Sequence, residues 1–263
     1  MEEISNKNQL IFEPSMVEAL LRLSKKEYIW LDLISAAPVD QVFAIGNYEA
    51  LVLDIDEVIR LTHIFSRVID FRSKFTARHS AGVAVTAQKL AELVNFSLIE
   101  CKMMLIAGFL HDIGKLAIDN EVLEKPAKLN TEEFNQMRSH TYYTYQILSM
   151  IPEFATIKVW ASYHHEKLNG QGYPFHISAE NLTLGSRIMA VADVFTAISE
   201  NRPYREGMED QKIKTVLTGM ADNHFIDSYL VGLLLNNYET FNQVRIDAQH
   251  QAAIAYDDFL NSY

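Results

Sequence analysis

Apolar side chains recur at intervals of three and four residues through most of this 263-residue chain. Such spacing places them on one face of an α-helix, because a helix completes a turn every 3.6 residues. The pattern predicts helices over 14–31, 61–68, 83–94, 97–112, 130–148, 157–164, 183–199, 209–220 and 226–240. The alternation typical of a strand is rare, and "DQVFAIG" at 40–46 is the best candidate for a short one. The sequence therefore predicts an all-α fold.

Polar residues at the starts of several predicted helices support these boundaries. Ser97 with Glu100, and Asn130 with Glu133, have the spacing of a capping box, in which two side chains satisfy the first backbone amides. Thr183 can cap the helix that follows it. The segment "AAPVDQ" at 36–41 is the expected joint between a helical lead-in and the main domain.

Charge and cysteine content exclude some classes of function. The chain has 23 basic and 34 acidic residues, a net charge of −11. A general binder of DNA or RNA usually presents a basic face, so we expect no nucleic-acid polymer as a partner. The single cysteine, Cys101, excludes an intrachain disulfide and a zinc ribbon. The sequence "MEEISNKNQL" does not have the pattern of a signal peptide, and the apolar runs are too short to cross a bilayer, so we expect a cytoplasmic protein without a membrane segment.

Two motifs combine histidine with chemically useful neighbours. "HDIGK" places His111, Asp112 and Lys115 at the end of a strongly apolar helix, where polar groups are expensive to bury unless compensated. A helix end that reaches solvent would explain Lys115 through the helix dipole, but not the His–Asp pair. "SYHHEKLNGQGYPF" places His164 and His165 before a turn with two glycines and a proline. Neighbouring helix residues point about 100° apart, so this pair can share an ion only where the helix ends. The alternative is one buried and one surface histidine.

Together the motifs resemble those of HD-GYP phosphodiesterases, a branch of the HD superfamily of metal-dependent phosphohydrolases. The similar segments follow the family's order and spacing over roughly 75–206: "ARHSAGVA" (77–84), "HDIGK" (111–115), "MRSHTYYTYQIL" (137–148), "HHEKLNGQGYP" (164–174) and "RIMAVADVFTAISENRPYR" (187–205). The resemblance implies an HD-type helical bundle as a catalytic domain over 54–263. Residues 1–53 are then a helical N-terminal extension that belongs to a regulatory or dimerising region.

The resemblance also implies a binuclear metal site. One ion would be held by His79, His111, Asp112 and Asp193, and a second by His140, His164 and His165, with Asp112 shared between them. Such a mixed nitrogen and oxygen set suits Fe or Mn, with Ni or Zn as alternatives, better than Mg or Ca. Some relatives recruit a third metal through a glutamate one turn before the first histidine. Phe75 stands at that position, so we expect two divalent ions.

The substrates that the resemblance implies are cyclic dinucleotides, either cyclic di-GMP or 3′,3′-cyclic GMP-AMP, cleaved to a linear dinucleotide and in part to mononucleotides. Asp112 and Lys115 are the expected catalytic residues, with Lys115 stabilising charge on the phosphoryl oxygens. Arg202 and Arg205 are expected to bind phosphate through forked hydrogen bonds. Tyr173 is expected to face a guanine. Solvated arginines and a tyrosine that packs within the turn are the alternatives.

The chain departs from the family pattern at three positions. Asn169 and Thr196 replace acids, and Thr144 stands where a small glycine is common. A carboxylate can accept both N1–H and N2–H of guanine, so its loss would relax a guanine requirement if these side chains contact the base. The alternative is that both face solvent and change nothing.

Other functions remain open at the level of sequence. A sensor or docking module that binds a cyclic dinucleotide without turnover would be favoured by a missing ligand, and none is missing. Another HD hydrolase, acting on mononucleotides, is disfavoured by "GQGYP" and "RPYR". A homodimer through the N-terminal helices and a diguanylate cyclase partner are both compatible with the sequence.

Overall fold

The computed structural model describes residues 13–23, 52–72, 76–125, 127–201 and 206–261, without side chains at 67–77 and 259–261. The chain divides into two compact units, Met1–Val52 and Leu53–Tyr263. In the first unit the structure describes one helix, α2 (Pro14–Leu23), which begins at the proline and buries Val17. The predicted strand at 40–46 and the joint at 36–41 lie outside the described residues.

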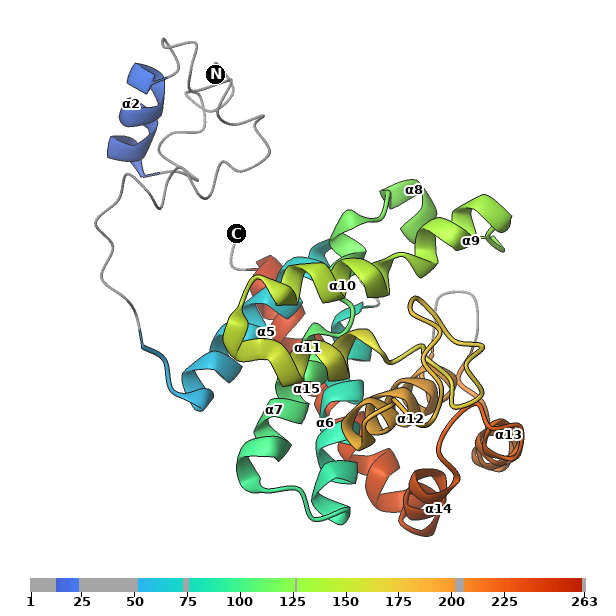
Figure 1. Cartoon of the computed structure of the whole chain (residues 1–263). Coiled ribbons are helices and arrows are strands. Elements are labelled where there is room, and N and C mark those ends of the chain that lie inside the picture. Colours follow the sequence, from blue (N-terminus) through green and yellow to red (C-terminus); the bar gives the residue numbers. More distant parts are fainter. Residues whose placement is uncertain (1–12, 24–51, 73–75, 126, 202–205, 262–263) are drawn as a thin grey trace. The chain divides into compact units, whose positions relative to one another are not determined.

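In the described part of the second unit every regular element is a helix, which confirms the all-α prediction (Figure 1). The one β-type contact in this part is an isolated bridge between Asn169 and Ser178. Its helices are α5 (Ile55–Arg72), α6 (Thr76–Leu93), α7 (Leu98–Leu110), η1 (Ile113–Ala117), α8 (Asn120–Leu123), α9 (Thr131–Arg138), α10 (His140–Ser149), η2 (Pro152–Phe154), α11 (Ala155–Ser162), α12 (Leu184–Ser199), α13 (Asp210–Asp222), α14 (Ser228–Asn236) and α15 (Tyr238–Asn261). None of the helices in these stretches is long and apolar enough to span a membrane.

Helix α6 is at the centre of the unit and packs against α7, α12 and α15 (Figure 1). Its residues Val83, Ala87 and Leu90 are fully buried, as the three-and-four spacing predicts. Small residues bring α6 and α7 close together, because a Cβ on Gly108 would lie only 2.3 Å from the Cα of Ala84. A larger side chain at Gly108 would therefore separate the two helices that carry the first histidines of the motifs.

The predicted caps are confirmed. Ser97 and Glu100 form a capping box at α7, and Asn130 and Glu133 form another at α9. The Thr183 hydroxyl accepts the amide of Ser186 at the start of α12. These interactions are local in sequence, which is why spacing alone identified them.

Three helical details differ from the prediction. The helix expected over 226–240 is divided at Asn237 between α14 and α15. The helix expected over 130–148 is broken at Ser139, whose hydroxyl bonds the carbonyl of Gln136, so α9 and α10 are separate. On α5 the apolar stripe with Leu61, Ile64 and Phe65 faces solvent, with exposed fractions of 38%, 55% and 53%. The face that packs inward instead carries residues such as Val58 and Ile59 beside buried Thr62 and Ser66.

Candidate metal centre

The structure brings together all seven side chains that the sequence assigned as metal ligands. Three overlapping groups each have ligand atoms within 4.8 Å of one another: His140, His164 and His165; His79, His111 and Asp193; and His111, Asp112 and His164. Six of the seven residues are buried, and the side chain of His165 is 31% exposed. Helix α11 ends at Ser162, so His164 and His165 lie in the turn that follows. Their side chains are therefore not held about 100° apart, as neighbours in a helix would be.

Three of the histidines are oriented in the same way. Nδ1 of His111 lies 2.7 Å from the carbonyl oxygen of Gly108, and Nδ1 of His140 lies 2.6 Å from that of Met137. His164 repeats the contact with Ala161 at 2.6 Å. A carbonyl can only accept, so each Nδ1 carries the proton and each Nε2 presents a lone pair. Such a bond at the far nitrogen is the usual support of a metal-binding histidine.

The inward-facing nitrogens lack the partners that would satisfy them. Nε2 of His140 and Nε2 of His164 are 3.3 Å apart, and neither has a proton to share. Nε2 of His111 is buried without a hydrogen bond. Burial lowers the pKa of His140 to about 3 and that of His164 well below its usual range, so protonation does not relieve the contact. A divalent cation between these lone pairs would relieve it, and the donor set therefore fits a metal.

The two aspartates stay ionised within the centre. Burial alone would raise the pKa of Asp112, but the facing His111 and Lys115 outweigh it and hold that pKa well below its usual value. Asp112 places Oδ2 at 3.3 Å from Nε2 of His111 and Oδ1 at 3.4 Å from Nε2 of His140. Its two oxygens thus face different histidine groups, which is the geometry expected of a ligand shared by two ions. The pKa of Asp193 is lowered in the same way, with His79 as its strongest stabilising partner.

His79 differs from the other histidines because a carboxylate, not a backbone carbonyl, bonds its Nδ1. Glu200 Oε1 lies 3.1 Å from Nδ1, and Asp193 Oδ1 lies 3.0 Å from Nε2. Burial lowers the pKa of His79, but Glu200 and Asp193 together outweigh it and raise the value to about 9. Sequence reasoning missed Glu200, which lies in the matched segment but has no spacing signal that links it to His79.

Lys115 lies beside the centre with its side chain 21% exposed. Its ammonium contacts Oδ2 of Asp112 at 2.5 Å. The backbone of "HDIGK" is held against α10 through Thr144, whose hydroxyl accepts the amide of Gly114 at 3.0 Å and donates to the carbonyl of His111 at 2.9 Å. Gly114 is required here, because a Cβ would lie 1.9 Å from the carbonyl oxygen of His140.

The loop after His165 folds back on Glu166. Both carboxylate oxygens of Glu166 accept backbone amides, from Phe175 at 2.7 Å and from Ile177 at 3.0 Å. The Glu166 carboxylate therefore holds the returning loop. A Cβ on Gly172 would lie 2.3 Å from the Cα of Glu166, so the close return of the loop depends on this glycine. The Tyr173–Pro174 bond is cis.

Tyr173 lies at the edge of the centre, with its ring between two other groups. The ring centroid is 4.9 Å from that of His165, and the guanidinium carbon of Arg138 lies 4.6 Å above it. Burial, together with the nearby Asp193 carboxylate, raises the pKa of Tyr173, so the phenol stays protonated at neutral pH. Sequence reasoning missed Arg138, which brings a positive charge to the edge of the centre from the last turn of α9.

The other predicted substrate contacts lie apart or cannot be placed. The Asn169 side chain is exposed, and its amide oxygen accepts the backbone amide of Gln171. Thr196 is fully buried between α12 and α6, and a substrate contact there would require that interface to open. Arg202, Arg205 and Phe75 lie outside the described residues or side chains.

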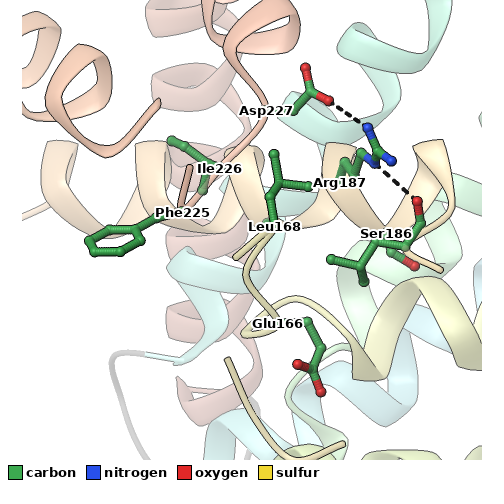
Figure 2. Close-up of a pocket in the computed structure, with 9 residues that line it drawn as sticks. Glu166, Leu168, Ser186, Arg187, Phe225, Ile226 and Asp227 are labelled. Atoms are coloured by element: carbon green, nitrogen blue, oxygen red, sulfur yellow. Dashed lines mark hydrogen bonds and ion pairs between the residues drawn. The ribbon is translucent and has the colours of Figure 1, made fainter. Parts of the chain in front are cut away.

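A small hollow lies where the 168–182 loop meets α12 and the start of α14, and Figure 2 shows the residues that line it. Its arginine, Arg187, uses all three of its nitrogens: it donates to Asp227 at 3.1 Å and to the carbonyls of Leu182 and Ala179 at 3.0 and 2.6 Å. These bonds fasten the 168–182 loop to α12 and to the start of α14. Arg187 thus supports the loop.

The chain resembles curated proteins of Vibrio cholerae and Xanthomonas campestris. It is 30% identical to 3′3′-cGAMP-specific phosphodiesterase 1 of Vibrio cholerae over 93% of this chain and 57% of the relative. It is 33% identical to phosphodiesterase 3 of the same specificity and organism, over 82% of this chain and 47% of the relative. The cyclic di-GMP phosphodiesterase response regulator RpfG of Xanthomonas campestris is 38% identical over 54% of this chain and 38% of its own length. The chain spans about half the length of these relatives.

A solved structure and a family description agree with this relationship. A crystal structure of a cyclic GMP-AMP specific phosphodiesterase of Vibrio cholerae (V-cGAP3) matches with a TM-score of 0.52 and 28% identity, over 89% of this chain and 55% of that one. The HD domain family matches residues 63–230, which is more than half of the chain. The predicted family resemblance is thereby confirmed: the chain belongs to the HD domain family and is related to its cyclic-dinucleotide phosphodiesterases.

Proposed function

We propose that this chain is a bimetal phosphodiesterase that hydrolyses a cyclic dinucleotide, cyclic di-GMP or 3′,3′-cyclic GMP-AMP, to a linear dinucleotide. The observation that carries the proposal is the convergence of five imidazoles and two carboxylates, in which Asp112 faces histidines of both groups. The activities of the relatives, which are phosphodiesterases for 3′3′-cGAMP or cyclic di-GMP, support the choice of substrate class.

The seven side chains would hold two divalent ions. His79, His111 and Asp193 would bind the first ion, His140, His164 and His165 would bind the second, and Asp112 would contact both. The mixed nitrogen and oxygen donors favour Fe or Mn, with Ni or Zn as alternatives. A pair of such ions supplies Lewis-acid activation of a phosphodiester and of water.

The chain's own residues would then bind and orient the substrate. Lys115 can turn from Asp112 toward a phosphoryl oxygen, because a lysine has a flexible stem and three donors. Tyr173 is fixed between His165 and Arg138, so it walls the site and offers its edge to a substrate. Arg202 and Arg205 remain proposed phosphate contacts on the sequence alone.

The test combines metal analysis with turnover. The chain is prepared with Fe or Mn under reducing conditions, its metal content is measured, and cyclic di-GMP and 3′,3′-cyclic GMP-AMP are followed to linear products by chromatography. We expect two ions per chain and hydrolysis of at least one substrate. Two bound ions with binding but no turnover would favour the sensor instead, while no metal or three ions would contradict the assignment of the site.

A further inference from the structure

A network of hydrogen-bonded polar side chains connects helix α15 to His79. Gln249 Nε2 donates to Oε2 of Glu200 at 3.1 Å, while the other oxygen of Glu200 faces Nδ1 of His79 at 3.1 Å. Arg245 Nη1 donates to Oε1 of Gln249 at 2.6 Å, and its Nη2 donates to Asn242 at 2.6 Å. Apart from Asn242, which is half-buried, every member is at most 9% exposed.

The direction of each hydrogen bond in this network is fixed by which groups can donate and which can only accept. A guanidinium can only donate, so Gln249 must turn its oxygen to Arg245 and its NH₂ group to Glu200. A carboxylate can only accept, so His79 must carry its proton on Nδ1. In the metal-free chain Nε2 shares a second proton with Asp193 at 3.0 Å, and a bound ion would take the place of that proton. The network therefore fixes one ring orientation of His79 and, with an ion bound, one tautomer.

The charges and the packing indicate that this contact is built in. A buried guanidinium is expensive unless an anion compensates it. Burial lowers the pKa of Arg245, and Glu200 is the carboxylate that most strongly opposes that effect. Gly82 makes room for the approach, because its Cβ would lie 3.0 Å from Gln249 Nε2 and 3.2 Å from Arg245 Cγ.

We propose that Arg245 and Gln249 are positioning residues of the metal centre, which act on His79 through Glu200. Both lie on α15, beyond residues 63–230 where the family matches. The inference rests on the proposed function, since it assigns the network a role in holding one of the two ions. Because His79 is the proposed ligand that Glu200 bonds, the network should affect the ion bound with His111 and Asp193 and leave the other unchanged.

The experiment is a cobalt titration of the full metal-free chain, followed by equilibrium dialysis and by the visible absorption of bound Co²⁺. We expect the native chain to bind two equivalents. Gln249→Leu and Glu200→Gln should weaken one of them by about 10–100-fold, the range usual for residues that support a metal ligand, and change its absorption band. Gln243→Leu is the matched control: Gln243 is exposed on the same helix, its side chain donates to Asp247, and the substitution should leave both equivalents unchanged.

Several outcomes would overturn the proposal. Unchanged cobalt binding in folded Gln249→Leu would show that the network does not position His79. Equal weakening of both equivalents would show general loosening of the fold. If Gln249→Leu does not fold, Gln249→Met keeps the side-chain length without the amide, and failure of both to fold would make the network structural only. A native chain that binds no cobalt would instead overturn the proposed function, and the role of the network with it.

Discussion

The Thr144 hydroxyl joins "HDIGK" to α10 through two hydrogen bonds. Its removal should lower the stability of the fold by a measurable amount. Thr144 is fully buried, accepts the amide of Gly114 at 3.0 Å and donates to the carbonyl of His111 at 2.9 Å. Thr144→Val keeps the shape and removes both bonds. Gly114 is near the start of η1, where the first amides have no acceptor within the helix.

The expected loss follows from the buried groups that remain. A buried amide without an acceptor costs about 1–3 kcal/mol, and the bond to the carbonyl adds about 1 kcal/mol. We therefore expect a loss of about 2–4 kcal/mol, which corresponds to a fall in Tm of roughly 4–16 °C for a unit of this size. Metal-free protein should be used, because a bound ion would add its own stabilisation.

The matched control for Thr144→Val is Thr141→Val, one turn earlier on α10. Thr141 is equally buried, but its hydroxyl only donates to the carbonyl of Arg138 at 3.0 Å, so its loss leaves no amide unsatisfied. We expect a change below about 1 kcal/mol. Thermal and urea unfolding of both variants would decide the question: equal shifts, or no shift for Thr144→Val, would refute the assigned role of Thr144.

Three further predictions concern the proposed metal centre and the loop beside it. Asp112→Asn should abolish turnover with a normal circular dichroism spectrum, because the carboxylate faces both histidine groups; near-native activity would place the site elsewhere. In the metal-free chain, the pKa of His79 is raised to about 9, so its contribution to stability is complete below pH 6.5, the unfolded value, and is lost as pH rises through 9. Urea unfolding should therefore show stability falling across pH 6.5–9, and a flat profile would contradict the ion pairs of His79. Asn169→Asp, at an exposed loop position, should raise the preference in kcat/KM for cyclic di-GMP over 3′,3′-cyclic GMP-AMP by about tenfold, the lower range for one base-edge contact, whereas buried Thr196→Asp should mainly lower stability. An unchanged ratio in Asn169→Asp would exclude that position as a reader of the base.

The helices and caps were predictable because their signals are local. Ser97 and Glu100 are three positions apart, as a capping box requires, and the structure contains that capping box. The α5 stripe was predicted to share a face, and it does, but spacing cannot say which face is covered. Buried Thr62 and Ser66 lie on the covered side, while Ile64 is exposed, because the neighbouring helices decide burial.

The ligand set was available from the motif resemblance, whereas its supporting residues were not. Arg245 and Gln249 lie in a helix that the sequence reasoning did not extend beyond 240, and each reads as a surface residue in isolation. They are buried only because Glu200, far away in sequence, compensates them. Arg138 was missed for a similar reason, since its contact with Tyr173 depends on how the loop returns.

Helix ends explain why His79 needs support that the other histidines do not. Gly108, Met137 and Ala161 lie in the last turns of α7, α9 and α11, where carbonyls have no amide partner within the helix. These carbonyls are the acceptors for Nδ1 of the histidines that follow three residues later.

His79 lies in the first turn of α6, where the carbonyl three residues earlier, that of Thr76, belongs to the helical ladder. Its Nδ1 must therefore find an acceptor on another segment, and Glu200 supplies it. That carboxylate is at the C-terminal end of α12, and Gln249 helps to fix its orientation. A ligand within a helix thus requires a second element to orient it, which is why we expect the contribution of α15 to be confined to the ion that His79 would bind.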